Sequence, residues 1–396
     1  MKHFVEKIIE FIIKGCGFIS AVIVLLIVFF LFREGVLFIN SSPLEDHHAL
    51  FIHKDNSVND LTETQIKNIF DKKITNWKEL GAFDQKITLI SADEIDELFT
   101  ETQLGKNFEY LSVCVNHYMD TVPGTIAYFS EKHLSLTPGI KQISIQKISL
   151  WKFLSGKEWF PTAKPAAIMG TLPLLMGTLL VSLLAILIAL PLGLAAAVYL
   201  AEIADERVRK ILKPIIELLS GIPSVVYGFF GLVIIVPFIQ SFFNLPVGET
   251  ALAGSILLAI MALPTIITVS EDAIRTCPLA IKEASLALGA SHWQTIFKVI
   301  IPYASSGITA AAILGIGRAV GETMAVLMVT GNAALLPTSL TQPVRTIPAT
   351  IAAELGEAPF GGLHFKSLFA LGCMLFLITL ITNLMVERIS KKSKLN

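Results

Sequence analysis

The stretch CPLAIKEASLALGASHWQTIFKVIIPY, residues 277–303, separates two long apolar runs of the chain. Pro278 suits the first turn of a helix, and Gly289 is placed to end that helix in a left-handed conformation. Ser291 begins a capping box, Ser-x-x-Gln, that starts a second short helix. Pro302 marks the entry to the next apolar run. The stretch therefore predicts two short helices joined by a glycine turn, a knob that suits docking into a groove on a partner protein.

The composition around this knob is that of a membrane protein. Of the 396 residues, 53% are hydrophobic and only 16% are charged, and the mean hydropathy is +0.68. A soluble globular domain has about 25% charged residues, so the deficit predicts an all-α polytopic membrane protein. The net charge of −1 excludes no class of partner, because the charges are segregated rather than absent. Six runs are candidate spans: 15–32, 168–200, 218–246, 251–269, 303–329 and 368–386.

Two features flank the first span. Residues 2–14 place apolar side chains at helical spacing among lysines, which predicts either an interfacial helix or an N-terminal extension of the first span. No small-residue cleavage site follows the first apolar run, so we expect it to stay as an anchor. The four cysteines lie far apart, so no disulfide framework or metal cluster is expected: Cys16, Cys114, Cys277 and Cys373.

The basic residues predict the orientation. Lysines precede the first span, DERVRKILK joins the second and third, and further basic residues lie between the fourth and fifth and at the C-terminus. The opposite short loops hold almost none. The positive-inside rule therefore predicts that both termini are cytoplasmic and that the long polar segment 40–165 lies outside.

The predicted pair of short helices at residues 277–303 resembles a loop of a known protein family. EASLALG, nine residues and then VIIP resemble the EAA loop of ABC importer permeases, with Ser285 in place of the second alanine. The resemblance implies that Glu283, Ala284, Gly289 and Pro302 belong to a loop that couples the permease to a cytoplasmic ATPase. The chain has no G-x-x-x-x-G-K-[ST] phosphate loop of its own, so pumping energy has to come from another polypeptide.

The resemblance widens over the rest of the chain. WKFLSGKEWFPT, IALPLGLAAAVYLAE, LKPIIELLSGIPSVVYGFFGLVIIVPFI and GIGRAVGETMAVLMVTGN resemble in succession the phosphate importer permeases of the PstC type. The resemblance implies a non-enzymatic subunit with six transmembrane helices in the type I ABC importer permease fold, in the bacterial cytoplasmic (inner) membrane. It also implies four kinds of partner: phosphate, a homologous second permease, a cytoplasmic ATPase dimer and a periplasmic phosphate-binding protein. No cofactor, metal or nucleic acid is implied.

One apolar run contains charge. In GIGRAVGETMAVLMV, Arg318 and Glu322 stand four residues apart, so on one helix they face the same side and form a pair. Gly315, Gly317 and Gly321 beside them let a neighbouring backbone or a ligand approach. A guanidinium offers a dianion a planar donor fork that stays protonated, and a competing carboxylate lets the anion leave. The resemblance implies a role in transport for both charges. The alternative is a structural ion pair that locks the helix against a neighbour.

Other functions stay open. The outer loop residue Arg345 is a weaker candidate for attracting the anion. The alternative is that Arg345 is simply a solvated charge on the loop. In one alternative interpretation, the transported oxyanion is sulfate or molybdate. In another, the chain is a membrane sensor that uses the outer segment. An intramembrane enzyme is disfavoured, because G-x-S-x-G and H-E-x-x-H motifs do not occur. His47, His48 and His53 are expected to be solvated rather than metal ligands.

The outer segment has the sequence pattern of a small folded domain. Thr62 begins a capping box, and Ile66, Ile69 and Phe70 give the following helix an apolar face. KITLIS and GTIAYFS predict strands, so a small α/β domain is expected between the first and second spans. The predicted domains are 1–39 with the interfacial helix and first span, 40–150 with this insertion, and 151–396 with the five-span permease core.

The insertion resembles one lobe of a periplasmic phosphate-binding protein. LTETQIKNIFDKKITNWKELG and TVPGTIAYFSEKHL carry the likeness, over about half the size that two lobes need. Where that family holds phosphate with a Ser/Gly/Thr-rich turn at a helix N-terminus, this chain has SADEIDELF. Asp93, Glu94, Asp96 and Glu97 repel a dianion there, which predicts a degenerate lobe. Such a lobe docks the true binding protein, pairs with a lobe on the partner permease, covers the entrance, or is a tolerated insertion without function.

Overall fold

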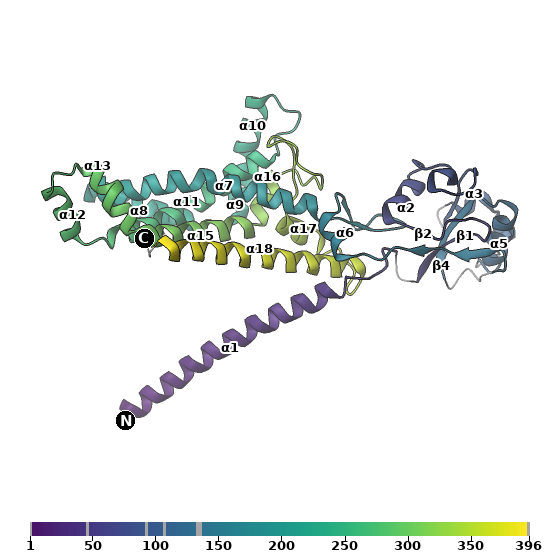
Figure 1. The fold of residues 1–396 in the computed structure, drawn as a ribbon, viewed down its shortest axis with the longest axis horizontal. Coiled ribbons are helices and arrows are strands. Elements are labelled where there is room, and N and C mark those ends of the chain that lie inside the picture. The colour runs from purple at the N-terminus through teal and green to yellow at the C-terminus, as the bar shows by residue number, and fades with distance from the viewer. Residues whose placement is uncertain (1, 45–46, 92–93, 106–107, 132–136, 394–396) are drawn as a thin grey trace. The chain divides into compact units, whose positions relative to one another are not determined.

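The computed structural model describes residues 2–44, 47–91, 94–105, 108–131 and 137–393, which fall into two compact units (Figure 1). The helical unit comprises Met1–Gly35, Thr171–Ala358 and Leu368–Asn396. The insertion unit comprises Val36–Gly170 and Pro359–Ser367. Each unit has its own buried core.

Within the described part of the chain, five helical segments are long and apolar enough to cross a membrane, and they lie wholly or mostly in the helical unit. They are Ile9–Val36, Leu172–Ile203, Ser224–Phe243, Ala251–Arg275 and Leu363–Met385. A sixth candidate is a bent pair, His292–Tyr303 with Ser305–Gly321, whose parts meet at 69°. The helices are α1 (Lys2–Val36), α7 (Leu172–Val198), α8 (Glu206–Ser220), α9 (Ser224–Phe230), α10 (Val236–Phe243), α11 (Ala251–Arg275), α12 (Leu279–Ala287), α13 (His292–Thr295), α14 (Ile301–Tyr303), α15 (Ser305–Gly321), α16 (Met324–Val329), α17 (Ile347–Glu354) and α18 (Leu363–Ser393). Single π-helical turns, Tyr199–Ile203, Gly231–Ile235 and Ile296–Ile300, extend α7, α9 and α13.

Two expectations about the spans need correction. Residues 303–329 do not form one straight span, because α15 ends at Gly321 and α16 begins at Met324. The separate interfacial helix at residues 2–14 is also not formed. Helix α1 runs without a break from Lys2 to Val36, so the N-terminal stretch is an extension of the first span.

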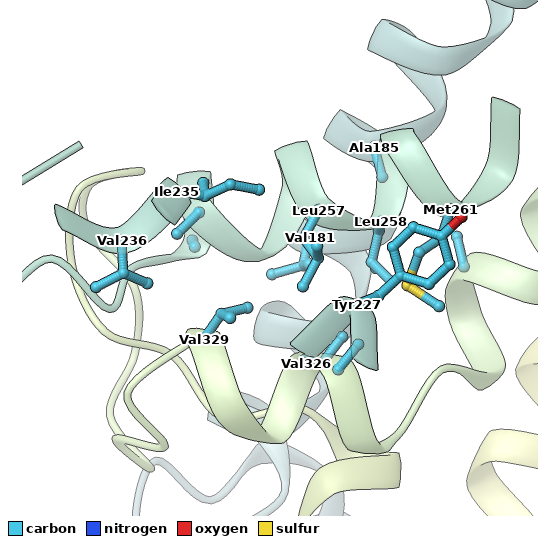
Figure 2. Close-up of a cluster of buried hydrophobic side chains, with 14 of the residues drawn as sticks. Val181, Ala185, Tyr227, Ile235, Val236, Leu257, Leu258, Met261, Val326 and Val329 are labelled. Carbon is cyan, nitrogen blue, oxygen red and sulfur yellow. The ribbon is translucent and has the colours of Figure 1, made fainter. Parts of the chain in front are cut away.

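The core of the helical unit lies where α11 packs between α7 and α15 (Figure 1). Figure 2 shows Leu257, Leu258 and Met261 of α11 meeting Val181 of α7 and Tyr227 of α9. Small side chains on α7 and α11 let the two backbones approach, since without a hydrophobic driving force membrane helices associate through close packing. The buried alanines of these helices include Ala185, Ala189, Ala259 and Ala262.

The insertion unit is built on a four-stranded sheet in the order β3-β4-β1-β5. Strand β1 (His48–His53) pairs antiparallel with β4 (Thr125–Ser130) and β5 (Ile140–Gln142), while β3 (Thr88–Ser91) runs parallel to β4. Alternate side chains of β1 and β4 enter two cores, one under α2 (Glu63–Phe70) and one under α5 (Leu111–Thr121). The two predicted strands and the Thr62–Gln65 capping box are confirmed. The smaller elements are β2 (Asp60–Leu61), α3 (Ile95–Leu98), α4 (Glu101–Leu104), β6 (Ser144–Ile145), α6 (Leu150–Ser155), β7 (Trp159–Phe160), β8 (Ile168–Met169) and a 3-10 turn, Trp77–Leu80.

This unit ends later than the boundary expected at residue 150. The WKFLSGKEWF motif folds onto it, because Phe153 packs between Phe38 and Trp159 with ring centroids 4.8 and 6.5 Å away. Phe153 and Trp159 are both buried. Helix α6 and the β7–β8 pair therefore belong to the insertion unit, which extends to Gly170.

Candidate functional site

The helix break around Glu322 changes the predicted charge pair. The backbone of Glu322 is extended, with φ −70° and ψ 131°, so Arg318 and Glu322 do not share a helix. The Glu322 carboxylate instead accepts hydrogen bonds from the backbone N–H of Thr323 at 3.2 Å and of Ala325 at 3.5 Å. An acidic side chain at the start of a helix satisfies donors that have no partner within the helix. The expected ion pair is therefore not formed, because Glu322 turns to the first turn of α16.

Arg318 has a different partner. Its Nη1 donates to the hydroxyl of Thr265 on α11 at 3.3 Å, and both side chains are partly buried. Among the residues that the structure describes, no carboxylate forms an ion pair with this guanidinium. The bundle therefore holds a partly buried cation that is hydrogen-bonded to a hydroxyl group.

The three glycines beside Arg318 differ from one another. A Cβ built on Gly315 would lie 3.0 Å from Ile266, so this position is closely packed against α11. Equivalent atoms on Gly317 and Gly321 would meet nothing within 4 Å. One glycine thus permits helix packing, and the other two leave the backbone open beside the helix break.

Arg345 is not a solvated loop charge. Its Nη1 lies 2.7 Å from Glu354 Oε1, and the two side chains are only 21% and 14% exposed. The backbone carbonyl of Arg345 also packs against Gly177 of α7, where any Cβ would clash with it. A guanidinium that already forms an ion pair with an internal carboxylate attracts other anions weakly. Arg345 therefore holds the loop before α17 in place.

The predicted helix–turn–helix knob is confirmed as a local structure. Gly289 has φ +84° at the end of α12, and Ser291 forms the capping box that starts α13. Glu283, Ala284 and Pro302 are exposed. Apolar side chains on the same hairpin are also exposed: Leu279, Leu286, Leu288, Trp293 and Phe297, with Leu288 at 90%. The hairpin therefore presents an apolar surface with an acidic residue beside it.

Two buried acidic groups escaped the sequence interpretation. Glu271 on α11 is 1% exposed and lies within 3.1–3.5 Å of three cations, Arg209, Lys213 and Arg275. Burial alone would lower the pKa of Lys213, but its hydrogen bonds and charge contacts with Glu271 and Asp272 outweigh burial and raise the pKa above 10.5. The sequence did contain a signal for Glu271, because a charged residue next to an apolar run often has a functional or structural role.

The second group is Glu202, at the end of the π-helical turn that extends α7. Lys282 of α12 lies 2.5 Å from its carboxylate, and the two side chains are 19% and 8% exposed. Cys277, which is 4% exposed, lies close to both charges, and burial raises the pKa of its thiol. This pair joins the hairpin to a long span.

The insertion unit shows no metal site among its described residues. In the described parts of the chain, no group of three or more His, Cys, Asp or Glu side chains is placed to hold a metal ion. His48 stacks on Tyr128, and His53 lies 3.6 Å from Asp55. Of the acidic turn after β3, Asp93 and the side chains of Asp96 and Glu97 lie outside the described residues. Glu94 is described and accepts a hydrogen bond from Ser91 at 3.4 Å.

A bundle of membrane-length helices with an exposed helical hairpin and a cation inside the bundle defines a polytopic transport component. The chain belongs to the family of binding-protein-dependent transport system inner membrane components, whose model matches residues 189–395. A second model, the PBP superfamily domain, matches residues 44–148. The predicted identification as an ABC importer permease, a non-enzymatic membrane subunit, is confirmed, with a binding-protein-like domain inserted.

Two relatives named as permeases agree with this assignment. The chain is 40% identical over 256 residues to "Probable ABC transporter permease protein YqgH" of Bacillus subtilis, which covers 65% of this chain and 82% of that protein. It is 39% identical over 250 residues to the "Phosphate transport system permease protein PstC" of Mesorhizobium japonicum, covering 58% and 75%. An ABC-type phosphate transport receptor from Vibrio cholerae matches 28% of this chain and 50% of its own, at 20% identity and a TM-score of 0.20.

Proposed function

We propose that this chain is the permease subunit of an ATP-driven phosphate importer and forms half of the translocation pathway. The observation that carries the proposal is Arg318, a partly buried guanidinium held by a hydroxyl and without a carboxylate partner among the described residues. Relatives named as phosphate transport permeases support phosphate as the substrate.

The chemistry of the site suits a dianion in transit. The guanidinium offers phosphate two parallel N–H donors and keeps its charge at any physiological pH. Thr265 holds one Nη1 in place, which leaves the other donors for the ligand. Glu322 caps α16 in this conformation. A movement between α15 and α16 that brings its carboxylate to Arg318 would displace the anion and let it leave.

The backbone beside Arg318 supports a polar pathway on this side of α15. Irregular backbone at membrane depth is tolerated only where protein covers it or water reaches it. Glu322 and Thr323 interrupt the helix, and Gly317 and Gly321 carry no side chain that covers it. In the proposal this surface faces the pathway and the homologous second permease, not lipid.

The remaining parts follow from the same proposal. The hairpin around Gly289 docks on a cytoplasmic ATPase dimer, and a periplasmic phosphate-binding protein delivers the anion. Both termini lie in the cytoplasm of a bacterial cell, the insertion lies outside, and the helical unit adopts the type I importer fold with six spans. The positive-inside pattern of Lys and Arg supports this orientation.

The insertion acts, in this proposal, as a degenerate lobe that does not bind phosphate by itself. A two-lobed binding protein closes a cleft around its ligand, whereas the described residues of this unit form one four-stranded sheet and two small two-stranded sheets. Docking of the separate binding protein is the role that fits its match to a binding-protein domain.

The test of the substrate is uptake by the whole complex. The permease is reconstituted in liposomes with its ATPase, second permease and binding protein, and labelled phosphate is added with ATP inside. We expect ATP-dependent phosphate accumulation that unlabelled phosphate suppresses and equimolar sulfate or molybdate does not. Suppression by sulfate or molybdate at least as strong as by phosphate would assign the importer to another oxyanion.

A further inference from the structure

The coupling hairpin is attached to the bundle by two joints of different kinds. The first joint is apolar. Ile296 and Ile300, which follow α13, share one buried core with Ala197 and Val198 of α7 and with Ile274 of α11. This joint holds the second half of the hairpin, α13 and its π-helical turn, against the ends of two spans.

The first half of the hairpin, α12, is held differently. None of its residues is buried, and its apolar side chains Leu279 and Leu286 are 68% and 45% exposed. It is connected to α13 by the hydrogen bond between the hydroxyls of Ser285 and Thr295 at 2.9 Å. Its connection to the spans is ionic: the Lys282 ammonium donates to the Glu202 carboxylate at 2.5 Å.

The ion pair between Lys282 and Glu202 lies in a largely buried environment. Glu202 is 8% and Lys282 is 19% exposed, so water screens the pair weakly. Taking either partner away leaves an uncompensated charge in a largely dry place, which is strongly unfavourable. The pair therefore resists separation when α12 is displaced, and the displacement passes to the end of α7.

Helix α7 is well placed to receive such a displacement. Its Ser182 hydroxyl donates to the carbonyl of Ala319, next to Arg318, at 3.4 Å. Farther along, its Gly177 packs against the backbone of Arg345. One continuous helix thus touches both the coupling hairpin and the segment that carries the candidate anion site.

We propose that Lys282 and Glu202 are positioning residues that transmit movement of the coupling hairpin to α7 and so link ATP hydrolysis to opening of the pathway. The proposal rests on the proposed importer function. It assigns to this pair mechanical coupling, not attachment of the ATPase, because the exposed apolar surface of the hairpin is available for attachment.

The experiment exchanges the charges in the reconstituted complex. The variants are Lys282→Glu, Glu202→Lys and the double exchange, and the control is Lys210→Glu, a lysine on α8 that is 72% exposed and lies outside the hairpin. Three quantities are measured for each: ATPase co-purification, ATP hydrolysis, and phosphate taken up per ATP hydrolysed. A role in attachment alone moves the first quantity, whereas a role in coupling moves the third.

We expect each single exchange to retain the ATPase while phosphate taken up per ATP falls by about tenfold, a common size for coupling between sites. The double exchange restores most of this ratio, and the control leaves it unchanged. If a single exchange does not assemble, Glu202→Gln, which keeps the side-chain shape, is judged by the same ratio.

Two outcomes would overturn the proposal: an unchanged ratio in the variants that assemble, or a double exchange no better than the single ones. Both are distinct from failure of the importer function. If the proposed importer function is wrong, the unmodified complex itself shows no ATP-dependent phosphate uptake.

Discussion

At the scale of single residues, the separation of Arg318 from Glu322 has the largest consequence for function. Four-residue spacing predicts a pair only while the helix continues. Here Glu322 leaves the helix and caps the next one, so the cation is held by the Thr265 hydroxyl instead. A neutral partner fixes the guanidinium without neutralising its charge, as the proposed anion site requires.

The role of Thr265 is testable with two substitutions. Thr265→Val keeps the shape but removes the acceptor, and a hydrogen bond to a charged group contributes about 1.5–3 kcal/mol. We expect phosphate uptake to fall by at least about tenfold, the equivalent of the lower end of that range. Thr265→Ser keeps the hydroxyl and should retain most of the uptake. Equal uptake by the valine and serine variants would remove Thr265 from the site.

Glu271 makes a second residue-scale prediction, this time about stability. Glu271→Gln leaves Arg209, Lys213 and Arg275 without their shared anion. The three cations are 27–39% exposed and retain contact with water, so we expect a loss of about 1–3 kcal/mol, below that of a fully buried pair. The measurement is thermal unfolding of the purified permease in detergent. Glu217→Gln, on the exposed side of α8, is the matched control and should leave the midpoint unchanged.

The pH dependence of this cluster follows from Lys213. Its pKa is raised in the folded protein, so its contribution is fully present below the unfolded value of 10.5 and is lost as the pH rises through the higher folded value. The difference between the Glu271→Gln variant and the unmodified protein should therefore stay constant from neutral pH up to mildly alkaline pH. A difference that disappears at mildly alkaline pH would contradict this assignment of the charge on Lys213.

At the scale of elements, the local signals were reliable and the tertiary ones were not. The capping boxes at Thr62 and Ser291 and the left-handed Gly289 depend on neighbours in sequence, and all were predictable. The break at Glu322 was not, because the glutamate's competing role as a cap depends on whether the helix ends there. The Lys282–Glu202 contact joins residues 80 positions apart, and spacing along one element carries no information about such a pair.

The glycine turn of the hairpin gives an element-scale prediction. Gly289 has φ +84° with open space around it, so a side chain there meets a backbone cost and no clash. Gly289→Val should distort the turn, because a β-branched residue resists positive φ, and the permease should then fail to co-purify with its ATPase. Gly289→Asn is the control, since asparagine tolerates this conformation. Equal co-purification of both variants would show that the turn geometry is not required for docking.

At the scale of the whole molecule, two units with separate cores share one chain. The insertion unit buries residues on both faces of its sheet and has the features of a domain. The helical unit leaves apolar side chains of α1, α9 and α10 exposed, as expected for surfaces that lipid or another membrane protein covers. Length and hydropathy predicted this division, whereas the boundary at Gly170 required the packing of Phe153 and Trp159.

The orientation of the two units across the membrane is testable by labelling. In a background with both Cys16→Ser and Cys114→Ser, Lys78→Cys places a thiol on the insertion, where the lysine is 71% exposed, and Leu288→Cys places one on the hairpin, where the leucine is 90% exposed. A membrane-impermeant maleimide should label Cys at position 78 in intact cells and Cys at position 288 only after permeabilisation. The reverse pattern would invert the proposed topology.

Arg318 is the proposed countercharge along the phosphate pathway, and ATP-driven phosphate uptake by Arg318→Ala and Arg318→Lys tests this role. Both variants are reconstituted with the partner subunits, and ATPase co-purification is checked first. We predict that both assemble, that the alanine variant takes up no phosphate above background, and that the lysine variant is severely impaired, because a point charge does not reproduce a planar fork. Normal uptake by an assembled Arg318→Ala complex would contradict the pathway and leave Arg318 with a structural role only.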